Sequence, residues 1–385
     1  MRGLATAART VRAMRTRTAA PIASFALLVL ALAGCTAGSD ADESTTRRSA
    51  TAGPAPTDLA TGEVAPTGAV SDVATDLDAP WSVVLTDDDV PLVSLRDSGD
   101  VLEVGDHGDT RTVGTIEGVR HGGEGGLLGL ALHDDDLYVY STGDDGNRVE
   151  RYALTGSAGS YALGDAATVI DDLPANSFHN GGRIAFGPDD MLYVTVGDAG
   201  NRSEAQDRDS LAGKILRLTP TGEVPADNPF DGSPVWSLGH RNVQGLGWAS
   251  DGTMFASEFG ENTWDELNVI EPGADYGWPE VEGTGGVDQG FVDPVQQWRT
   301  SDASPSGLAV VDDTVFVANL RGEVLRSVPV SDPSTSREWF AGTYGRLRTV
   351  LAGPGDTLWF VTNNTDGRGS TGTGDDRILS VALTD

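Results

Sequence analysis

The stretch that decides the fold is Ser177-Phe178-His179-Asn180-Gly181-Gly182-Arg183-Ile184-Ala185-Phe186-Gly187, which continues after a short gap as Met191-Leu192-Tyr193-Val194-Thr195-Val196-Gly197-Asp198. The gap is Pro188-Asp189-Asp190, and a proline with two aspartates between apolar runs predicts a turn between two antiparallel strands. The loop before the first strand would then lie beside the loop after the second. His179 and Asp198 would meet although they are 19 residues apart, and a carboxylate beside an imidazole orients a general base.

The same pattern of apolar strand, Asp/Gly/Pro turn and β-rich strand recurs six times, about 40 to 60 residues apart, without a convincing amphipathic helix. Six such units favour an all-β fold, a six-bladed β-propeller; a pair of β-sandwiches is the competing arrangement. We expect Val73–Leu77 to be the strand that closes the ring with the last blade. The paired runs are 81–85 with 91–94, 127–132 with 137–140, 184–186 with 191–196, 244–248 with 253–257, 307–310 with 314–318, and 349–351 with 357–361.

In a propeller, the loops that enter the innermost strand and leave the second strand line one mouth of the central channel. This rule gathers several polar side chains at one end. Arginine binds carboxylates through two parallel hydrogen bonds, so the arginines among them predict a site for an anion. For any single arginine, a surface partner for a nearby acid is the alternative. The gathered positions are His179, Asp198, Arg241, Asn242, the loop from Glu258, Arg321, Arg346 and Arg348.

Residues 1–34 have the composition of a signal peptide. Five arginines and no acidic residue accompany an apolar run, Ile22–Leu32, that is too short to span a bilayer. The following Leu32-Ala33-Gly34-Cys35 resembles a bacterial lipobox, which implies a lipid on Cys35 and an anchor on the outer face of the bacterial cell membrane. An ordinary secretory signal with a chance cysteine is the alternative. Residues 35–70 are rich in Ala, Thr, Ser and Pro and predict a flexible tether, and residues 71–385 the globular domain.

The chain is strongly acidic. It has 26 basic and 58 acidic residues, a net charge of −32, and without the five arginines of the signal segment the charge is about −37. Such a charge argues against nucleic acid or an anionic lipid surface as a partner. Cys35 is the only cysteine, so the exported domain has no disulfide. Lys214 is the only lysine, and every other basic residue is an arginine.

Six short motifs follow one another along the domain: Gly123–Gly129, His179–Arg183, Gly239–Asn242, Asp265–Asn268, Asp275–Pro279 and Arg346–Arg348. With these motifs in this order, the chain resembles the soluble PQQ-dependent aldose sugar dehydrogenases of the glucose/sorbosone dehydrogenase family, over essentially the whole domain from Leu77. The resemblance implies an oxidoreductase that oxidises aldose sugars at the anomeric carbon to lactones. It implies pyrroloquinoline quinone (PQQ) and Ca²⁺ as cofactors and a separate electron acceptor.

The resemblance also assigns roles to residues. His179 would be the general base and Asp198 would hold its imidazole, while Arg241 would lie beside the reactive quinone oxygen. Glu124 stands where relatives have a glutamine close to the substrate and would contact the sugar. From its position beside Arg241, His240 is expected to support the residues that contact the ligand. The residues that would bind the cofactor are Arg241, Asn242, Arg346, Arg348 and Arg321, the last in place of a lysine in the soluble glucose dehydrogenases.

For the metal, the resemblance implies that the backbone carbonyls of Gly260 and Glu261 hold a Ca²⁺ at the quinone. A further, structural calcium would bind the Asp265 carboxylate with the carbonyls of Glu266 and Tyr276. An ordinary acidic turn is the alternative for this second site.

Two other functions compete with sugar oxidation. A non-catalytic propeller could bind a glycan or a protein, and loss of His179 or of the arginines would favour it, but both are present. A calcium-dependent lactone or ester hydrolase would need a metal deep in the channel held by Glu, Asn and Asp side chains, a pattern that is not evident in the sequence.

Overall fold

A computed structural model of the chain describes residues 51–52, 59 and 62–384. The expected signal segment, Cys35 and most of the expected tether lie outside the described residues. In the part of the chain that is described, no helix has the length and apolar character needed to cross a membrane. The structure consists of β-strands with two short 3₁₀-helices, η1 (Arg202–Gln206) and η2 (Val287–Gln289).

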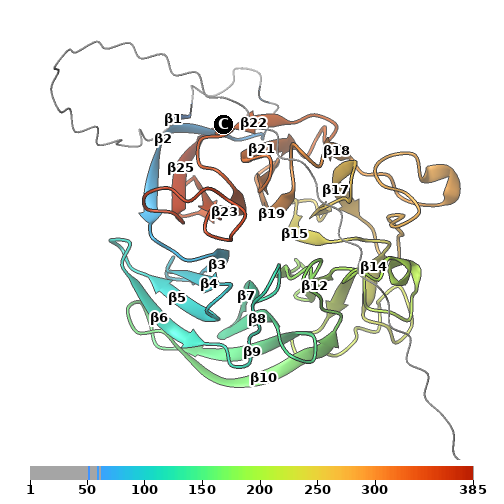
Figure 1. Cartoon of the computed structure of the whole chain (residues 1–385), viewed down its shortest axis with the longest axis horizontal. Coiled ribbons are helices and arrows are strands. Elements are labelled where there is room, and N and C mark those ends of the chain that lie inside the picture. The colour runs from blue at the N-terminus through green and yellow to red at the C-terminus, as the bar shows by residue number, and fades with distance from the viewer. Residues whose placement is uncertain (1–50, 53–58, 60–61, 385) are drawn as a thin grey trace, which may run out of the picture. The chain divides into compact units, whose positions relative to one another are not determined.

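The strands form six antiparallel sheets arranged as the blades of a propeller (Figure 1). Blade 1 contains β3 (Pro80–Leu85), β4 (Pro91–Leu95), β5 (Asp100–Val104) and β6 (Thr110–Thr115); blade 2 contains β7 (Leu127–His133), β8 (Asp136–Thr142), β9 (Asn147–Thr155) and β10 (Ala162–Leu173). Blade 3 contains β11 (Ile184–Phe186), β12 (Leu192–Val196), β13 (Lys214–Leu218) and β14 (Val235–Leu238); blade 4 contains β15 (Val243–Trp248), β16 (Met254–Glu258), β17 (Trp264–Ile270) and β18 (Gln296–Arg299). Blade 5 contains β19 (Pro305–Val311), β20 (Thr314–Asn319), β21 (Val324–Pro329) and β22 (Arg337–Trp339).

Blade 6 joins the two ends of the described chain. Its strands are β23 (Leu347–Gly353), β24 (Thr357–Thr362) and β25 (Ile378–Thr384), and then β2 (Ala65–Ala74) and β1 (Thr51–Ala52). The expected closing strand, Val73–Leu77, is wrong in its position: β2 begins at Ala65 and pairs with β25 up to Ala74. The backbone turns left-handed at Asp76, with φ of 60°, so the strand cannot continue to Leu77. β2 also includes the last residues of the range assigned to the tether.

The six-bladed propeller predicted from the sequence is confirmed, and the pair of sandwiches is excluded. The innermost strands β3, β7, β11, β15, β19 and β23 contact one another in ring order. The hairpin predicted at Pro188–Asp190 is also confirmed: Ile184 pairs with Val194 and Phe186 with Leu192. The amide of Gly187 closes the turn by donating to the carbonyl of Met191 at 2.9 Å.

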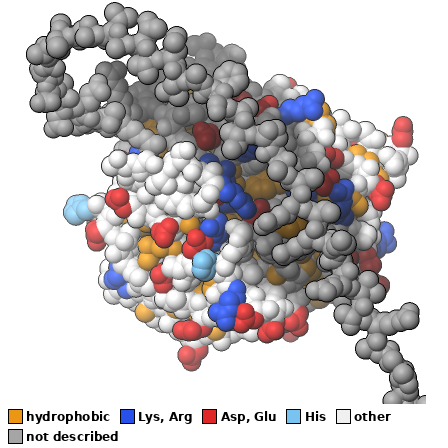
Figure 2. All heavy atoms as spheres, in the orientation of Figure 1, with side chains coloured by type: hydrophobic (Ala, Val, Ile, Leu, Met, Phe, Trp, Pro, Cys, Tyr) orange, Lys and Arg blue, Asp and Glu red, His pale blue; other side chains and the backbone are white. Residues whose placement is uncertain are grey.

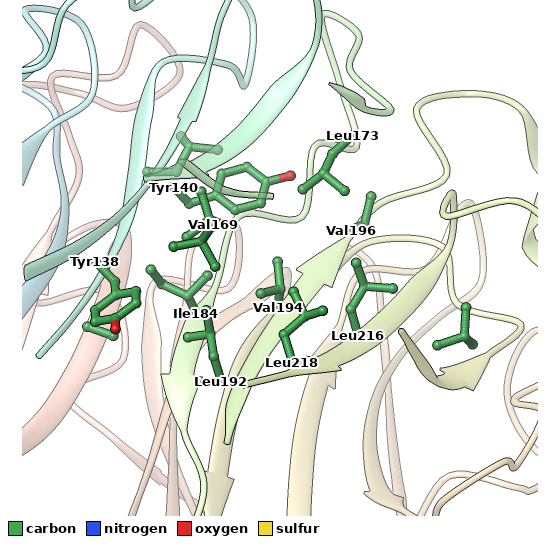
Figure 3. Packing of buried hydrophobic residues seen from close by; sticks show 14 of the residues in the cluster. Tyr138, Tyr140, Val169, Leu173, Ile184, Leu192, Val194, Val196, Leu216 and Leu218 are labelled. Atoms are coloured by element: carbon green, nitrogen blue, oxygen red, sulfur yellow. The ribbon is translucent and has the colours of Figure 1, made fainter. Parts of the chain in front are cut away.

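The core lies between neighbouring blades, as six clusters of buried apolar side chains. Figure 3 shows the cluster between blades 2 and 3, where Tyr140 of β8 and Ile184 of β11 face Val194 of β12. All five residues of β12 are buried because a blade packs on each face of the sheet. This packing explains why the inner strands are nearly continuous apolar runs. It also leaves the polar loops at the ends of the strands free to carry the site.

Candidate active site

His179 and Asp198 meet at the mouth of the channel, as the hairpin predicts. His179 precedes β11 and Asp198 follows β12, and the His179 Nδ1 atom lies 2.7 Å from Asp198 Oδ1. The imidazole is 13% exposed, whereas the Asp198 side chain is fully buried. A carboxylate that accepts at Nδ1 requires the proton on that nitrogen, which leaves the lone pair on Nε2. The dyad is therefore arranged to accept a proton at Nε2.

Three donors surround the Asp198 carboxylate: His179 Nδ1 and the Gly200 amide (2.8 Å) at Oδ1, and the Trp278 indole Nε1 (2.9 Å) at Oδ2. Burial raises the pKa of Asp198. The hydrogen bonds from His179, Gly200 and Trp278, together with the charge of His179, lower the pKa by more than burial raises it, so the net pKa shift is downward. Asp198 therefore stays ionised at neutral pH and can stabilise a positive charge on His179.

The backbone around His179 is held in an uncommon shape. His179 has a φ of 56°, and the Glu124 carboxylate accepts its amide proton at 2.9 Å. Its carbonyl accepts the amide of Ala199 at 3.2 Å. A Cβ atom added to Gly197 would clash with this carbonyl, so the close approach of the two loops requires glycine at that position. Glu124, which is expected to contact substrate, thus fixes the backbone of His179.

Arg241 and Asn242 lie on the short loop between β14 and β15, next to the dyad. Glu258 at the end of β16 accepts the backbone amides of both residues, and the Arg241 carbonyl accepts the Asp198 amide at 2.8 Å. The Asn242 Oδ1 atom accepts the Gly181 amide at 3.0 Å. These contacts join the loop of blade 3 to blade 4. Burial lowers the pKa of Arg241, and the nearby acids, Asp198 foremost, oppose that shift.

His240, beside this loop, is completely buried. Its Nδ1 atom lies 2.9 Å from Glu258 Oε2 and its Nε2 atom lies 2.8 Å from the Ser237 hydroxyl. Both ring nitrogens are therefore engaged by the protein. This placement agrees with the supporting role predicted for His240.

On blade 6, Arg346 and Arg348 share one acid, Asp366. Arg346 Nη2 lies 3.0 Å and Arg348 Nη2 lies 3.9 Å from Asp366 Oδ2. Burial raises the pKa of Asp366, but the two arginines lower it more and the net pKa shift is downward. Arg348 also donates to Asn363 and to the Gln244 side chain (2.8 Å). One face of the molecule shows basic side chains beside acidic ones near its middle (Figure 2).

The Arg183 side chain lies in the central channel and joins several blades. Its guanidinium lies 4.3 Å from the centre of the Trp81 ring and donates to the Gln244 carbonyl (2.8 Å), to Ser82 and to Thr349. It thereby connects blades 3, 4, 1 and 6 across the channel. In the sequence, Arg183 stands out only as the last residue of the His179–Arg183 motif. The spacing of residues does not reveal which blades its side chain reaches.

Three donors at this mouth have no acceptor. Arg241 Nε, Asn242 Nδ2 and Arg346 Nε are buried and without a hydrogen-bond partner in the described part of the chain. A buried donor without a partner costs free energy, about 1–3 kcal/mol for a neutral group and more for a charged one. Such donors fit a ligand rich in anionic oxygens, which would accept from all three.

Arg321 is not brought together with the other predicted cofactor residues. It is exposed on the loop after β20 and lines a separate cavity of about 560 Å³ with Trp264, Arg299 and Arg326. None of His179, Arg241, Arg346 or Arg348 lines that cavity. A role of Arg321 toward a cofactor stays a prediction.

Three of the five predicted metal residues, Gly260, Glu266 and Tyr276, line a small cavity next to Arg241, and Glu261 and Asp265 do not. Its volume is about 10 Å³, enough for one water or ion, and Glu258, Gly260, Glu266, Tyr276 and Glu282 are among the residues that line it. In residues 62–384, no three acidic or histidine side chains converge as a metal site by themselves. A cation here would therefore depend on backbone oxygens too.

The carboxylates near this cavity differ. Asp265 is not among the residues that line it; its carboxylate accepts the amides of Gly260 (2.8 Å) and Ser304 (2.6 Å), and burial raises its pKa to about 6. Glu266 lines the cavity, and burial and the neighbouring charge of Glu258 raise its pKa. Glu266 and Tyr276 thus line the same cavity, and the calcium role expected for Asp265 stays a prediction.

The geometry also reveals residues that the sequence did not single out. Arg368 Nη1 lies 3.3 Å from Glu124 Oε1, and Phe178 is 40% exposed with its ring edge against His179, at 4.6 Å between centroids. Asp366 and Arg368 lie in an irregular loop after β24, where no periodicity points to them. Trp278 lies in the Asp275–Pro279 motif, which was the only signal for it.

A family model described as Glucose / Sorbosone dehydrogenase matches residues 77–371. An aldose sugar dehydrogenase of Escherichia coli (strain K12) is 29% identical over 340 residues, 76% of this chain and 89% of that protein. The quinoprotein glucose dehydrogenase B of Acinetobacter calcoaceticus is 31% identical over 251 residues, 55% of this chain and 52% of that protein, so the match spans about half of each.

Among solved structures, the PQQ-bound form of an aldose sugar dehydrogenase from Streptomyces coelicolor superposes on this chain with a TM-score of 0.79. The two sequences are 47% identical, and the match covers 84% of this chain and 98% of the other.

Proposed function

The chain belongs to the glucose/sorbosone dehydrogenase family of sugar-oxidising enzymes, and from this premise we propose that it oxidises the anomeric hydroxyl of aldose sugars to lactones with PQQ and Ca²⁺. The observation that carries the proposal is the His179–Asp198 dyad at the channel mouth, beside buried donors of Arg241, Asn242 and Arg346 that lack acceptors. A proton acceptor next to a pocket for an anion suits sugar oxidation by an anionic quinone.

Oxidation at the anomeric carbon removes a proton from the hydroxyl and a hydride from the carbon, and leaves the C=O bond of the lactone. His179 Nε2 accepts the proton, because Asp198 holds the proton on Nδ1 and stabilises the imidazolium that results. PQQ supplies the two-electron acceptor for the hydride. The Arg241 guanidinium interacts electrostatically with Asp198 and would stabilise negative charge on a ligand oxygen close to it.

The arginines present fit PQQ. It is planar and has three carboxylates, and Arg346 and Arg241 each hold a buried Nε donor ready for one. Arg348 would contribute its charge from below, since Asn363 and Gln244 already engage most of its donors. Asn242 would offer its Nδ2 donor.

Calcium fits the loop after β16. In the described residues, no donor is hydrogen-bonded to the carbonyls of Gly260 and Glu261, and Ca²⁺ prefers such oxygens with carboxylates. A second calcium near Tyr276 would take Glu266 as its carboxylate, since Glu266 and Tyr276 line the same cavity and Asp265 is not among the residues that line it. A cation would relieve the repulsion between Glu258 and Glu266.

The sugar would lie between Phe178 and the Glu124–Arg368 pair. Phe178 offers an exposed apolar ring beside the base, and Glu124 and Arg368 offer an acceptor and a donor to hydroxyl groups.

For the rest of the chain we propose export and a lipid anchor at Cys35, with the enzyme on the outer face of the bacterial cell membrane. This proposal depends on the lipobox-like sequence Leu32–Cys35. The electrons would then pass to a separate acceptor.

The test uses the protein from residue 36 onward. The purified protein is mixed with PQQ and Ca²⁺, and reduction of a redox dye is followed with a panel of aldoses. We expect sugar-dependent reduction that requires PQQ and is lost in EDTA. Absence of reduction with every sugar, together with no PQQ-dependent change in absorbance, would refute the proposed function.

A further inference from the structure

Trp278 makes a contact that the proposed reaction does not assign to it. The residue belongs to a loop of blade 4, is 6% exposed, and donates its indole Nε1 proton to Asp198 Oδ2 of blade 3 at 2.9 Å. The two residues are 80 positions apart in the chain. The indole therefore contacts the carboxylate that holds His179, on the side away from the imidazole.

This donor decides how the carboxylate is oriented. Asp198 is completely buried, and its Oδ1 atom already accepts from His179 and from the Gly200 amide. Trp278 is the partner of Oδ2 among the described residues. Without it, one oxygen of a buried carboxylate would have no donor, and the carboxylate could rotate away from the plane of the imidazole.

The faces of the same indole hold two arginines. The guanidinium carbon of Arg202 lies 4.4 Å from the ring centre and that of Arg241 lies 5.4 Å from it. The Arg241 side chain donates a 3.2 Å hydrogen bond to the Phe259 carbonyl, and its Nε has no hydrogen-bond partner in the described residues. The ring face thus limits where the Arg241 guanidinium can move.

Trp278 itself is firmly placed. Its amide donates to the Gly239 carbonyl at 2.9 Å, and its carbonyl accepts from the Gln206 side chain at 2.9 Å. Arg202 closes the outer side, paired with Glu261 at 2.6 Å. The indole is fixed by its backbone and is therefore able to fix its neighbours.

We propose that Trp278 is a positioning residue for sugar oxidation, whose N–H orients Asp198 and hence His179 while its ring face holds Arg241. The inference rests on the proposed function for its kinetic consequence, but its geometric part concerns the free protein. No contact of Trp278 with substrate is involved, so its effect should appear in the rate and not in KM.

The experiment compares Trp278→Phe with Trp236→Phe in the full mature protein with PQQ and Ca²⁺. Trp236 is a matched control, because its buried indole N–H has no partner in the described residues and it lies away from the mouth, between Tyr193 and Arg217. We expect Trp278→Phe to lower kcat about 10-fold, the order for losing a hydrogen bond to a charged group, with little change in KM. Trp236→Phe should stay within about 2-fold of the unsubstituted protein.

A double-substitution cycle separates positioning from general damage. If Trp278 acts through Asp198, Trp278→Phe should have little further effect on kcat in an Asp198→Asn background. Trp278→Leu, which loses both the N–H and the ring face, should lower kcat further than Trp278→Phe, since Arg241 is then released as well. Additive effects of Trp278→Phe and Asp198→Asn would overturn the proposal.

A measurement without cofactor covers the geometric part. In ¹H–¹⁵N NMR spectra of the free protein, the His179 Nδ1 proton should exchange faster with water in Trp278→Phe than in Trp236→Phe. The thermal unfolding midpoints of the two variants should be equal, so that the difference does not reflect a loss of stability. Unchanged exchange, or an equal loss of kcat in both variants, would contradict the inference while leaving the proposed function in place. An inactive unsubstituted protein would instead contradict the proposed function, and the exchange measurement would still decide the role of Trp278.

Discussion

At the scale of single residues, the site is built on buried carboxylates that are paired with basic side chains. Asp198 holds His179, Asp366 holds Arg346 and Arg348, and Glu258 holds His240. A buried charge with one partner removed is strongly destabilising, since the remaining charge has neither water nor counterion. Each pair is thus a constraint on the fold at the candidate site.

His179 is the residue whose loss should affect chemistry most. His179→Ala removes the proton acceptor at the mouth but none of the donors proposed for PQQ. We expect kcat to fall about 10²-fold or more, the order for a general base, with PQQ still bound. Dye reduction measures the first quantity and a PQQ absorbance titration the second. His107→Ala, at an exposed turn, is the control, and full activity of His179→Ala would show that another group is the base.

Asp198 should link stability to pH. Its pKa is lowered in the folded protein, so it contributes stability that is present above the ordinary aspartate pKa of about 3.9 and is lost as the pH falls through the folded pKa. Asp198→Asn removes this contribution, so its destabilisation should be larger at pH 6 than at pH 3.5. Urea unfolding at the two pH values measures it, with Asp88→Asn in an exposed turn as control. An equal effect at both pH values would argue that Asp198 is not ionised in the fold.

The residue contacts that could be predicted from sequence are those fixed by one hairpin. His179 and Asp198 flank β11 and β12, and antiparallel pairing brings them together. Trp278 and Asp198 are joined across two blades, and nothing local in the sequence encodes that contact. For Arg321 the sequence predicted a loop position after the second strand of a blade, but not that the residue lines a separate cavity.

At the scale of elements, the β11–β12 hairpin shows how a strand end shapes a site. Ile184 pairs with Val194, and the loops beyond the strands cross so closely that the His179 carbonyl lies against Gly197. The apolar strands and the turn were readable because their signals are local. The position of β2 was not, because its sequence APTGAVSDVA has few large apolar residues and its pairing with β25 spans the whole domain.

Gly197→Ala should damage this hairpin end. The added methyl group would meet the backbone carbonyl of His179, which cannot move without breaking its bond with Ala199. We expect a loss of about 1–3 kcal/mol in the free energy of unfolding, as in other overpacked sites, and a lower kcat. The control is Gly164→Ala in β10, where the nearest atoms to a Cβ lie at 3.4 Å and neither glycine has a left-handed backbone. Equal stability of the two variants in urea would contradict the close approach.

Blade 4 should be the element that responds to calcium. Glu258 and Glu266 are buried beside a cavity of ion size, and a cation there would stabilise the loops after β16 and β17. Adding Ca²⁺ to EDTA-treated protein should raise the thermal midpoint by several degrees, as expected for a ligand bound to the folded state alone. Glu266→Gln should reduce this rise and the exposed Glu280→Gln should not. A rise of equal size in Glu266→Gln would place the ion elsewhere.

At the scale of the whole molecule, the domain is a ring whose blades cover each other's apolar faces. Six clusters fill the six spaces between neighbouring blades, so each blade depends on two others. Arg183 and Arg348 add contacts across the channel between blades that are not neighbours in sequence. The sequence could predict the number of blades because each repeats a local pattern, whereas the cross-channel contacts depend on closure of the ring.

Ring closure by β2 gives the last test. β2 pairs with β25 over Ala65–Ala74. Val64 and Val70 belong to the core between blades 5 and 6, and Ala74 belongs to the core between blades 6 and 1.

A chain that begins at residue 76 would expose the edge of β25 and open both cores to water. We expect it to lose cooperative unfolding or to aggregate, whereas a chain that begins at residue 59 should keep the unfolding midpoint of the protein that begins at residue 36. Differential scanning calorimetry compares the three proteins. PQQ-dependent dye reduction should follow the same order, since Arg348 lies on the innermost strand of the blade that β2 completes and Arg346 directly precedes that strand. A cooperative, active protein beginning at residue 76 would show that the ring closes without its first strand.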